Sequence, residues 1–411
     1  MIKKILQKVF PSELSRGTFI LFVTMNVSNL LNFLFHFFMG RALEPEGYGV
    51  LAVLMSFVYI YSVPNEAIQN LISRYTSKLN LRKNYGKIKF LMLKALRRSF
   101  YVSAIIFGAA TLLTLFLSKI LEINFWLIFL TNITIFFAFS IPIVRGVLQG
   151  TKKFSRLGSS MVIESGLKLF FSISLVIFGF KVFGAVVGIL ISLFAALIFS
   201  LYFNKEVLSE EEENATFKEI YVTSIPYFTI MLAIFLFFSL DIIFAKVFFS
   251  PEIAGQYAVL SMLGKAIFLA TFAVSKAMFP LASEQKDKKE DSSKLFKKSL
   301  LIIVSLCAAL IILYAFIPKT VISVLYGAKY IEMSPYLIYS GLAFSFLSLS
   351  NLVLVYGLSI NKLRSIHYLF LFLILEVVLF FLFHNTILEY IFAFMVSNII
   401  MFIGSLFFLK R

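Results

Sequence analysis

Charged side chains are scarce in this chain. Of its 411 residues, 14% are charged and 60% are hydrophobic, whereas a soluble globular chain averages about 25% charged and roughly 45 to 50% apolar residues. So little charge excludes an ordinary soluble domain. Twelve membrane spans of about 20 residues would use about 240 residues, and the remaining connections leave no room for a second globular unit of about 100 residues. The sequence therefore predicts an integral membrane protein throughout.

The sequence also lacks disulfide partners, a phosphate-binding glycine loop and large charged outer loops. Its single cysteine, Cys307, lies in an apolar run, which excludes an internal disulfide and predicts core packing. Gly264 and Lys265 have no glycine five residues earlier and precede Ala266, so they do not form the glycine loop of an ATP-driven transporter. A membrane-embedded polymerase or glycosyltransferase would need catalytic acids on a sizeable loop, and the predicted outer loops are short and nearly uncharged. We therefore predict no enzymatic activity, no metal and no organic cofactor.

Apolar runs between charged or turn-forming clusters predict the membrane spans. Twelve candidates lie at about 17–40, 47–72, 96–118, 125–146, 156–180, 182–203, 219–248, 254–280, 299–317, 333–358, 365–384 and 386–409. The run at 219–248 exceeds one bilayer crossing, so it either tilts or starts at the interface. The predicted fold class is an all-α integral membrane protein with about 12 transmembrane helices.

The net charge of +17 is unevenly distributed between the predicted loops. Connections that follow odd-numbered spans contain only Arg41, Lys119, Lys181, Lys246, Lys319 and Lys329. Three further lysines lie inside spans, and all other Lys and Arg residues lie at the termini or after even-numbered spans. By the positive-inside rule, both termini are predicted to be cytoplasmic. The basic residues are thus explained by topology, and we predict no nucleic-acid partner.

One segment occurs twice, about half a chain apart. Pro45–Leu54 aligns without gaps to Pro251–Leu260 at an offset of 206, with identity at six of ten positions, and both segments follow an odd-numbered span. An even number of spans in two equal halves gives both halves the same orientation. We therefore predict two parallel six-helix bundles around a central cavity, at 1–204 and 219–411, joined by a cytoplasmic linker at 205–218. Within that linker, Glu210–Glu213 are expected to be a solvated hinge.

Two loops resemble a known family. The stretch 40–49 (GRALEPEGYG) after the first span, and the stretch 145–154 (RGVLQGTKKF) after the fourth, resemble loops of polysaccharide-biosynthesis flippases of the multidrug/oligosaccharidyl-lipid/polysaccharide (MOP) exporter superfamily. The resemblance implies a MATE-like fold in the bacterial cytoplasmic (inner) membrane. It also implies outward translocation of an undecaprenyl-pyrophosphate-linked oligosaccharide by alternating access, with the lipid bilayer and other polysaccharide assembly proteins as partners.

Three lysines lie within predicted spans, namely Lys168, Lys265 and Lys276. A lysine at a helix centre costs about 2.5 to 3.5 kcal/mol on insertion scales, so each needs a partner or an aqueous cavity. Lys265 shares a helix face with Ser261 and several aromatic residues, which suits a sugar-phosphate. The alternative is that Lys265 pairs with Asp241. Lys168 either pairs with Glu164, four residues earlier, or lines the cavity.

Polar residues form stripes on the first two spans. Asn29, Asn32 and His36 fall within one arc of the first span, and Glu66 lies on a polar face of the second span near the helix-bending Pro64. We predict that these stripes face the central cavity, with interhelical hydrogen bonding as the alternative. The repeat offset places Tyr59 at the position equivalent to Lys265, which adds this tyrosine to the predicted cavity.

Two arginines and four titratable residues are candidates for gating and coupling. Arg41 and Arg145 lie at opposite membrane faces, where each either contacts a substrate phosphate as a gate opens or anchors a helix end. The residues considered for H⁺ or Na⁺ coupling are Glu66, Asp241, His36 and Glu376.

A cation-coupled multidrug antiporter of the same superfamily is the alternative function, because it would have the same gross fold. Resemblance to proton-coupled members would call for an acidic residue in the first span, and none occurs between Gly17 and Gly40. The cationic residues within the spans favour an anionic cargo. The sequence thus favours the flippase over the antiporter.

Overall fold

The computed structural model describes residues 13–215, 225–362 and 368–408, and these residues form helices with no β-strand. Among them, ten helices are long and apolar enough to cross a membrane. This confirms the all-α membrane fold class. The predicted span ends at 219–224, 365–367 and 409 lie outside the described residues, as do the two chain termini.

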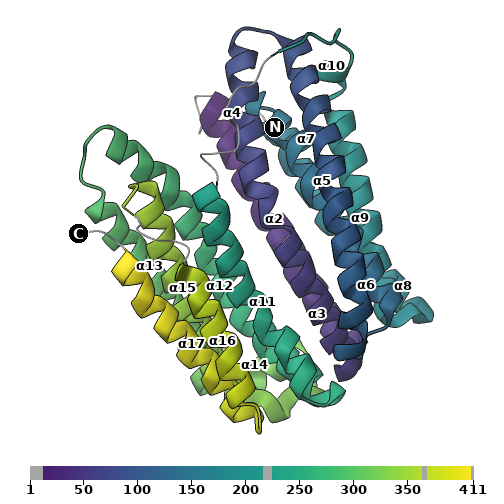
Figure 1. Cartoon of the computed structure of the whole chain (residues 1–411), viewed down its shortest axis with the longest axis vertical. Helices are drawn as coiled ribbons and strands as arrows, with labels where there is room; N and C mark the ends of the chain where they lie inside the picture. Colours follow the sequence, from purple (N-terminus) through teal and green to yellow (C-terminus); the bar gives the residue numbers. More distant parts are fainter. Residues whose placement is uncertain (1–12, 216–224, 363–367, 409–411) are drawn as a thin grey trace, which may run out of the picture. The chain divides into compact units, whose positions relative to one another are not determined.

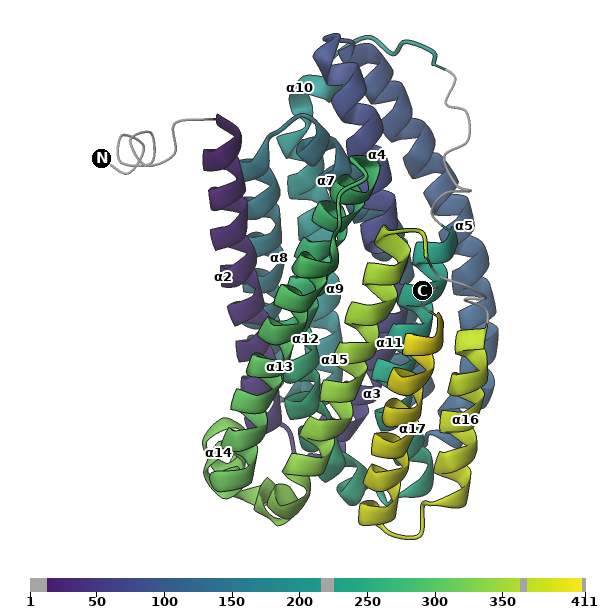
Figure 2. The same cartoon turned by 90° about the vertical axis from the view of Figure 1, so that its left-hand side faces the viewer.

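The described residues divide into two compact units. Unit 1 lies within Met1–Ala42 and Tyr61–Val222. Its elements are α2 (Glu13–Ala42), α4 (Pro64–Leu81), α5 (Tyr85–Ile120), α6 (Phe125–Asn132), α7 (Thr134–Gly150), α8 (Phe154–Leu175), the π-helical turn η1 (Val176–Phe180), α9 (Lys181–Phe203) and α10 (Lys205–Leu208). Within this unit α2 packs along α8, α8 along α9, and α4 along α7 (Figure 2).

Unit 2 contains Leu43–Ile60 together with the chain from Thr223 onward. Its elements are α3 (Pro45–Tyr61), α11 (Ile225–Phe248), α12 (Pro251–Asp287), α13 (Ser293–Phe316), α14 (Pro318–Leu325), the 3₁₀ helix η3 (Ala328–Tyr336), α15 (Leu337–Ser359), α16 (Leu369–Leu382) and α17 (Ile387–Phe408). The predicted boundary at 205–218 stays a prediction, and residues 216–218 lie outside the described chain. Helix α3 precedes that boundary in the sequence but belongs to unit 2 in the structure.

Two features reconcile ten long apolar helices with twelve predicted spans. The apolar stretch Phe154–Phe203 is 50 residues long, more than twice the length of about 20 residues that crosses a bilayer. It is interrupted at Gly179, whose φ of 92° lies in the left-handed region that glycine tolerates. The helix Leu369–Leu382 is apolar but has only 14 residues, so it falls below the length of a full span.

The α4–α5 hairpin is longer than predicted. Helix α5 has 36 residues and is therefore about 54 Å long, which exceeds the hydrocarbon thickness of about 30 Å. Helix α4 continues to Leu81, beyond the predicted end at 72. The extra turns carry the lysines and arginines of the basic loop. Helices α4 and α5 therefore extend beyond the apolar run (Figure 1). A hydropathy limit marks where a helix leaves the lipid and not where it ends.

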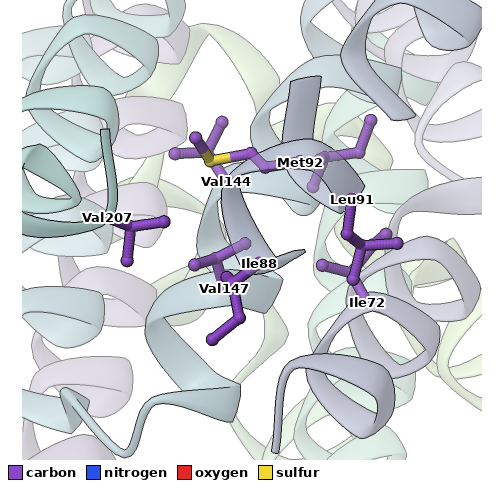
Figure 3. Close-up of a cluster of buried hydrophobic side chains, with 8 residues drawn as sticks. Ile72, Ile88, Leu91, Met92, Val144, Val147 and Val207 are labelled. Carbon is purple, nitrogen blue, oxygen red and sulfur yellow. The ribbon is translucent and has the colours of Figure 1, made fainter. Parts of the chain in front are cut away.

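Apolar side chains hold the polar end of unit 1 together. One buried cluster joins α4, α5, α7 and α10 (Figure 3). Its members are Ile72, Ile88, Leu91, Met92, Ile143, Val144, Val147 and Val207. The short helix α10 thus fastens the chain after α9 to the base of the hairpin.

Small residues allow α8 and α9 to approach closely. A Cβ on Gly184 would lie 2.8 Å from the carbonyl carbon of Leu175, and a Cβ on Gly188 would lie 2.5 Å from the amide nitrogen of Ser172. Ser172 also donates a hydrogen bond of 3.0 Å to the carbonyl of Ala185. The backbones touch at these points, as expected of small residues between membrane helices.

Gly188→Ala is expected to destabilise the protein, because the added methyl group forces α8 and α9 apart. Overpacking of this kind costs about 1–3 kcal/mol. Gly108→Ala is the matched control, since a Cβ there meets nothing within 4 Å and alanine favours a helix by about 1 kcal/mol. Unfolding of both variants in detergent tests this. Equal stability of the two variants would contradict the close contact.

Candidate functional site

The polar site of unit 1 is centred on Lys168 of α8. Its ammonium donates a hydrogen bond to Oδ1 of Asn32 and lies 4.6 Å from the centroid of the Phe35 ring on α2. The Lys168 side chain is half-buried. The two helices are held together nearby, where the Ser28 hydroxyl donates to the carbonyl of Met161 at 3.3 Å. One cation, one amide and one aromatic ring therefore meet between α2 and α8.

Glu164 and Lys168 form no close ion pair, although the Glu164 carboxylate lies within electrostatic range of the Lys168 ammonium. The Glu164 carboxylate instead accepts a hydrogen bond of 2.7 Å from Nη2 of Arg145 on α7. The same guanidinium donates from Nε to the Ser160 hydroxyl and from Nη2 to the Ser160 carbonyl, each at 3.0 Å. Helix spacing favoured a local pair, but a planar guanidinium from the neighbouring helix offers several donors at once.

Arg145 is buried and joins α7 to α8, which agrees with the alternative that it anchors a helix end. Arg41 is exposed, and its guanidinium lies 4.7 Å from the centroid of the Phe37 ring one turn earlier. The phosphate-gating role of both arginines stays a prediction.

The polar stripe of the first span is only partly brought to this site. Asn32 contacts Lys168, whereas His36 is buried with its ring edge-on to Phe35 at 5.2 Å, and Asn29 is exposed. On the second span, Glu66 is half-buried near the start of α4. The break predicted near Pro64 is present, because α3 ends at Tyr61 and α4 begins at Pro64.

The polar site of unit 2 is an ion pair between α11 and α12. Lys265 Nζ lies 3.2 Å from Oδ1 of Asp241, and their side chains are 1% and 0% exposed. The Ser261 and Tyr257 hydroxyls donate to Oδ2 of Asp241 at 2.5 and 3.2 Å. The ammonium also faces the Phe238 and Phe344 rings, at 5.1 and 6.0 Å from their centroids. The predicted polar and aromatic face around Lys265 is present. It surrounds the Lys265–Asp241 ion pair, which was the alternative to a sugar-phosphate site.

Glu376 of α16 is the second buried carboxyl group of unit 2. Its side chain is 0% exposed, and none of the described residues donates a hydrogen bond to either carboxyl oxygen. It lies within electrostatic range of Asp241. Tyr390 of α17, which the sequence analysis missed, donates its hydroxyl to the Asp241 carbonyl. The sequence could not predict this contact, because Tyr390 and Asp241 are 149 positions apart in the chain.

The other two predicted cavity residues, Tyr59 and Lys276, differ in their distance from the polar site of unit 2. Tyr59 packs edge-on against the Phe238 ring, with centroids 5.3 Å apart, and is half-buried. Lys276 is exposed, unlike Lys265 eleven residues earlier on the same helix. The structure thus brings Lys265, Ser261, Asp241 and Tyr59 into one neighbourhood and leaves Lys276 outside it.

A third group of charges lies beside the basic hairpin of unit 1. The two oxygens of Glu206 accept hydrogen bonds from Lys153 at 2.6 Å and from Arg156 at 2.8 Å. These bonds lower the pKa of the Glu206 carboxyl to about 2, and the bond from Lys153 has the largest effect. The group fastens α10 to the α7–α8 turn.

The acidic stretch Glu210–Glu213 is not a free hinge. Lys89 donates to the Glu210 carbonyl at 2.7 Å, and the Glu213 amide donates to the Gly86 carbonyl at 3.3 Å. A Cβ on Gly86 would lie 2.4 Å from the Glu211 carbonyl oxygen. The side chains are exposed as predicted, but the backbone lies against the first turn of α5. Negative side chains near a helix N-terminus are favourable, which explains the difference.

Glu206→Gln is expected to lower stability modestly and only above acidic pH. Because the folded-state pKa of Glu206 is lowered, its contribution is present above the unfolded value of about 4.3 and is lost as the pH falls towards 2. The exposed position limits the effect to about 1 kcal/mol or less. Unfolding in detergent at pH 7 and pH 3 checks this, and Glu212→Gln is the control. An equal loss at both pH values would contradict this ion-pair group.

The comparisons with known proteins agree with this architecture. A family model described as "Polysaccharide biosynthesis protein" matches residues 38–335. No curated protein sequence gives a significant match. Among solved structures, the chain resembles an inward-facing MATE family multidrug resistance transporter of the MOP superfamily, with a TM-score of 0.72, 13% identity and coverage of 94% of this chain and 97% of that one.

Two further structures show the same fold. One is the lipid II flippase MurJ in an inward closed conformation, with a TM-score of 0.69, 13% identity and coverage of 95% of this chain and 87% of that one. The other is a MOP superfamily transporter from Pyrococcus furiosus, with a TM-score of 0.62, 15% identity and coverage of 98% and 96%. The predicted MATE-like fold is thereby confirmed. Because the family model covers most of its length, the chain belongs to the polysaccharide biosynthesis protein family and has the fold of MOP superfamily transporters.

Proposed function

We propose that the protein is a flippase for an undecaprenyl-pyrophosphate-linked oligosaccharide. It moves the repeat unit from the inner to the outer leaflet of the bacterial cytoplasmic membrane by alternating access, with both termini cytoplasmic. The product serves surface polysaccharide biosynthesis of the O-antigen or capsule type, together with other polysaccharide assembly proteins. Membership of the polysaccharide biosynthesis family supports this process, and transporter neighbours support translocation over catalysis.

The environment of Lys168 is the observation that supports an anionic cargo. Its hydrogen-bond partner is the neutral amide of Asn32, while the nearby Glu164 carboxylate is paired with Arg145. A half-buried ammonium without a bonded counter-ion favours an anion such as pyrophosphate. The Phe35 ring and the Asn32 amide beside it suit a sugar, which offers an apolar face and hydroxyl groups.

The membrane potential favours this direction of transport. An anion that leaves a cell with a negative interior gains about 2.3 kcal/mol per charge per 100 mV. A pyrophosphate that moved without compensating cations would therefore be driven outward. The return of the empty carrier is then the step at which a coupling ion acts.

We propose that the coupling ion is H⁺ or Na⁺ and that Glu376 and Asp241 are its first candidates. A fully buried carboxylate is costly unless positive charge compensates it, and Lys265 compensates only one of the two. Glu66 and His36 are the corresponding candidates in unit 1. Collapsing the proton and sodium gradients separately, with the membrane potential clamped, should slow turnover for one ion, and unchanged turnover for both would refute coupling.

A cation-coupled multidrug antiporter is the second candidate, because a MATE family transporter is among the structural neighbours. An antiporter for organic cations needs an exposed carboxylate at membrane depth. The described part of the first span has none, and Asp241 and Glu164 are paired with Lys265 and Arg145. Glu376 is fully buried, which leaves the half-buried Glu66 as the antiporter's candidate. This pattern favours the flippase.

Ligand binding separates the two functions. The purified protein in detergent is heated with undecaprenyl-pyrophosphate oligosaccharide or with a panel of lipophilic cations. Stabilisation by the anionic lipid that weakens in Lys168→Met supports the flippase. Stabilisation by organic cations alone would replace it with the antiporter.

A further inference from the structure

Glu164 has two cations within reach, and they lie on different helices of unit 1. Lys168 is one turn further along α8, in the order that favours a Glu–Lys pair on a helix. Arg145 belongs to α7 and donates from Nη2 to the Glu164 carboxylate at 2.7 Å. The carboxylate thus bonds to Arg145 and lies only within electrostatic range of Lys168. The choice between these two partners determines how much positive charge remains at Lys168.

The fold holds the Arg145 guanidinium in the position that captures the carboxylate. Its Nε and Nη2 donate to the hydroxyl and the carbonyl of Ser160, each at 3.0 Å. The Ser160 hydroxyl lies 2.6 Å from that of Ser200 on α9. The residue before the arginine is also fixed, because Asn204 donates to the Val144 carbonyl at 3.1 Å. A guanidinium anchored in this way loses little further freedom when it binds a carboxylate.

The bond to Arg145 is the stronger of the two options for Glu164. The Arg145 and Glu164 side chains are only 10% and 28% exposed, and their hydrogen bond is short and charge-assisted. A Glu–Lys pair along one helix surface contributes much less. If the guanidinium were removed, the half-buried carboxylate would need another cation, and Lys168 is one turn away.

The distribution of charge shows what this arrangement does for an anion. Arg145, Glu164 and Lys168 together carry two positive charges and one negative charge, a net charge of +1. Because the carboxylate is bonded to Arg145, the net charge is located at Lys168, whose hydrogen-bond partner is the neutral Asn32 amide. A carboxylate bonded to Lys168 would instead place the net charge at Arg145, which is buried beside Ser160. An anion at Lys168 would then meet a neutral pair.

We propose that Arg145 is a positioning residue that holds the Glu164 carboxylate away from Lys168, so that the Lys168 ammonium can bind an anionic group. Arg145 does not contact the cargo in this role. The proposal rests on the proposed function, since the anionic group is the pyrophosphate of the cargo. The partner of Glu164 is a property of unit 1 alone, and it can be measured without cargo.

Binding of undecaprenyl pyrophosphate to the purified protein in detergent is the first test. Arg145→Gln is expected to weaken binding about ten-fold, as for the loss of one hydrogen bond to a charged group, because Glu164 then bonds to Lys168. The double variant Arg145→Gln/Glu164→Gln is expected to recover most of the affinity, because it has the same net charge as the parent. Arg156→Gln is the control, since it removes another arginine–carboxylate bond, of 2.8 Å to Glu206, from the same helix.

Recovery in the double variant separates positioning from a structural role. The double variant loses more native groups than Arg145→Gln, so a structural role predicts weaker binding still. Glu164→Gln alone keeps the guanidinium bonded to Ser160 and is expected to bind at least as tightly as the parent. A double variant as weak as Arg145→Gln, or an equally large loss in Glu164→Gln, would overturn the proposal.

Acetylation of Lys168, quantified by mass spectrometry, tests the proposal without cargo. An amine reacts only in its uncharged form, and a bonded carboxylate favours the charged form. Lys168 is therefore expected to react severalfold more slowly in Arg145→Gln than in the parent and at nearly the parental rate in the double variant, with the exposed Lys119 as internal reference. Equal rates in Arg145→Gln and the parent would overturn the positioning role. Slower acetylation in Arg145→Gln, with no lipid binding by any of these proteins, would support the positioning role and refute the proposed cargo.

Discussion

Lys168→Met is expected to weaken binding of the lipid-linked pyrophosphate by about ten- to a hundred-fold. A hydrogen bond to a charged group contributes about 1.5–3 kcal/mol, and 1.4 kcal/mol corresponds to a factor of ten. Methionine has a similar length and apolar character, so it retains packing against Phe35 while it removes the charge. Binding to the purified protein and transport in proteoliposomes are measured in parallel.

Two variants control for charge and position. Lys168→Arg retains a cation that reaches Asn32, so it should preserve most of the affinity. Lys119→Met removes one positive charge at the exposed end of α5 and should leave binding unchanged. Wild-type affinity in Lys168→Met would remove Lys168 from the substrate site.

The second large effect is expected at the buried pair of unit 2. Lys265→Met leaves the Asp241 carboxylate uncompensated between α11 and α12, and Asp241→Asn leaves the ammonium uncompensated. Removal of one partner of a buried pair costs about 3–5 kcal/mol. Each single variant should therefore be strongly destabilised, while the double variant should recover much of the loss, because two neutral side chains need no compensation.

Unfolding of the four proteins in detergent gives the coupling between the two side chains. Additive losses in the single and double variants would contradict the ion pair. Transport by the double variant then tests the role predicted for Lys265 in substrate binding. A stable double variant with full transport would limit Lys265 to stabilising unit 2, and a stable one without transport would support a further role.

The sequence predicted the class of fold well because the physics that determines it is local. Apolar runs of about 20 residues must be helices in a bilayer, since no water satisfies their backbone groups. The same analysis placed the end of the second span at 72 and the start of the third at 96, whereas the helices run to Leu81 and from Tyr85. Hydropathy reports contact with lipid, and helix propensity extends these elements beyond it.

The sites were predicted less completely because their contacts are tertiary. The face around Lys265 followed from helical spacing, and Asp241 was one of few acidic residues at membrane depth. In contrast, Glu164 had an ideal local partner in Lys168 but bonds to Arg145 from another helix. Tyr390 had no signal, because only the packing of α11 with α17 brings it to Asp241.

The repeat was visible in the sequence, but its consequence was not. The similarity of Pro45–Leu54 to Pro251–Leu260 indicated two related halves. It did not indicate that the copies touch, or that α3 groups with the later part of the chain. A repeat shows which residues are equivalent and not which of them are in contact, so the contact of Gly49 with Gly255 is seen only in the three-dimensional arrangement.

Translocation itself is the most direct test of the account. The purified protein is reconstituted into liposomes with a fluorescent undecaprenyl-pyrophosphate oligosaccharide, and a membrane-impermeant quencher reports the leaflet that holds the label. The account predicts protein-dependent movement between leaflets, accelerated by a potential that drives anions in the transport direction and lost in Lys168→Met. Movement no faster than in protein-free liposomes, together with efflux of lipophilic cations by the same vesicles, would contradict it.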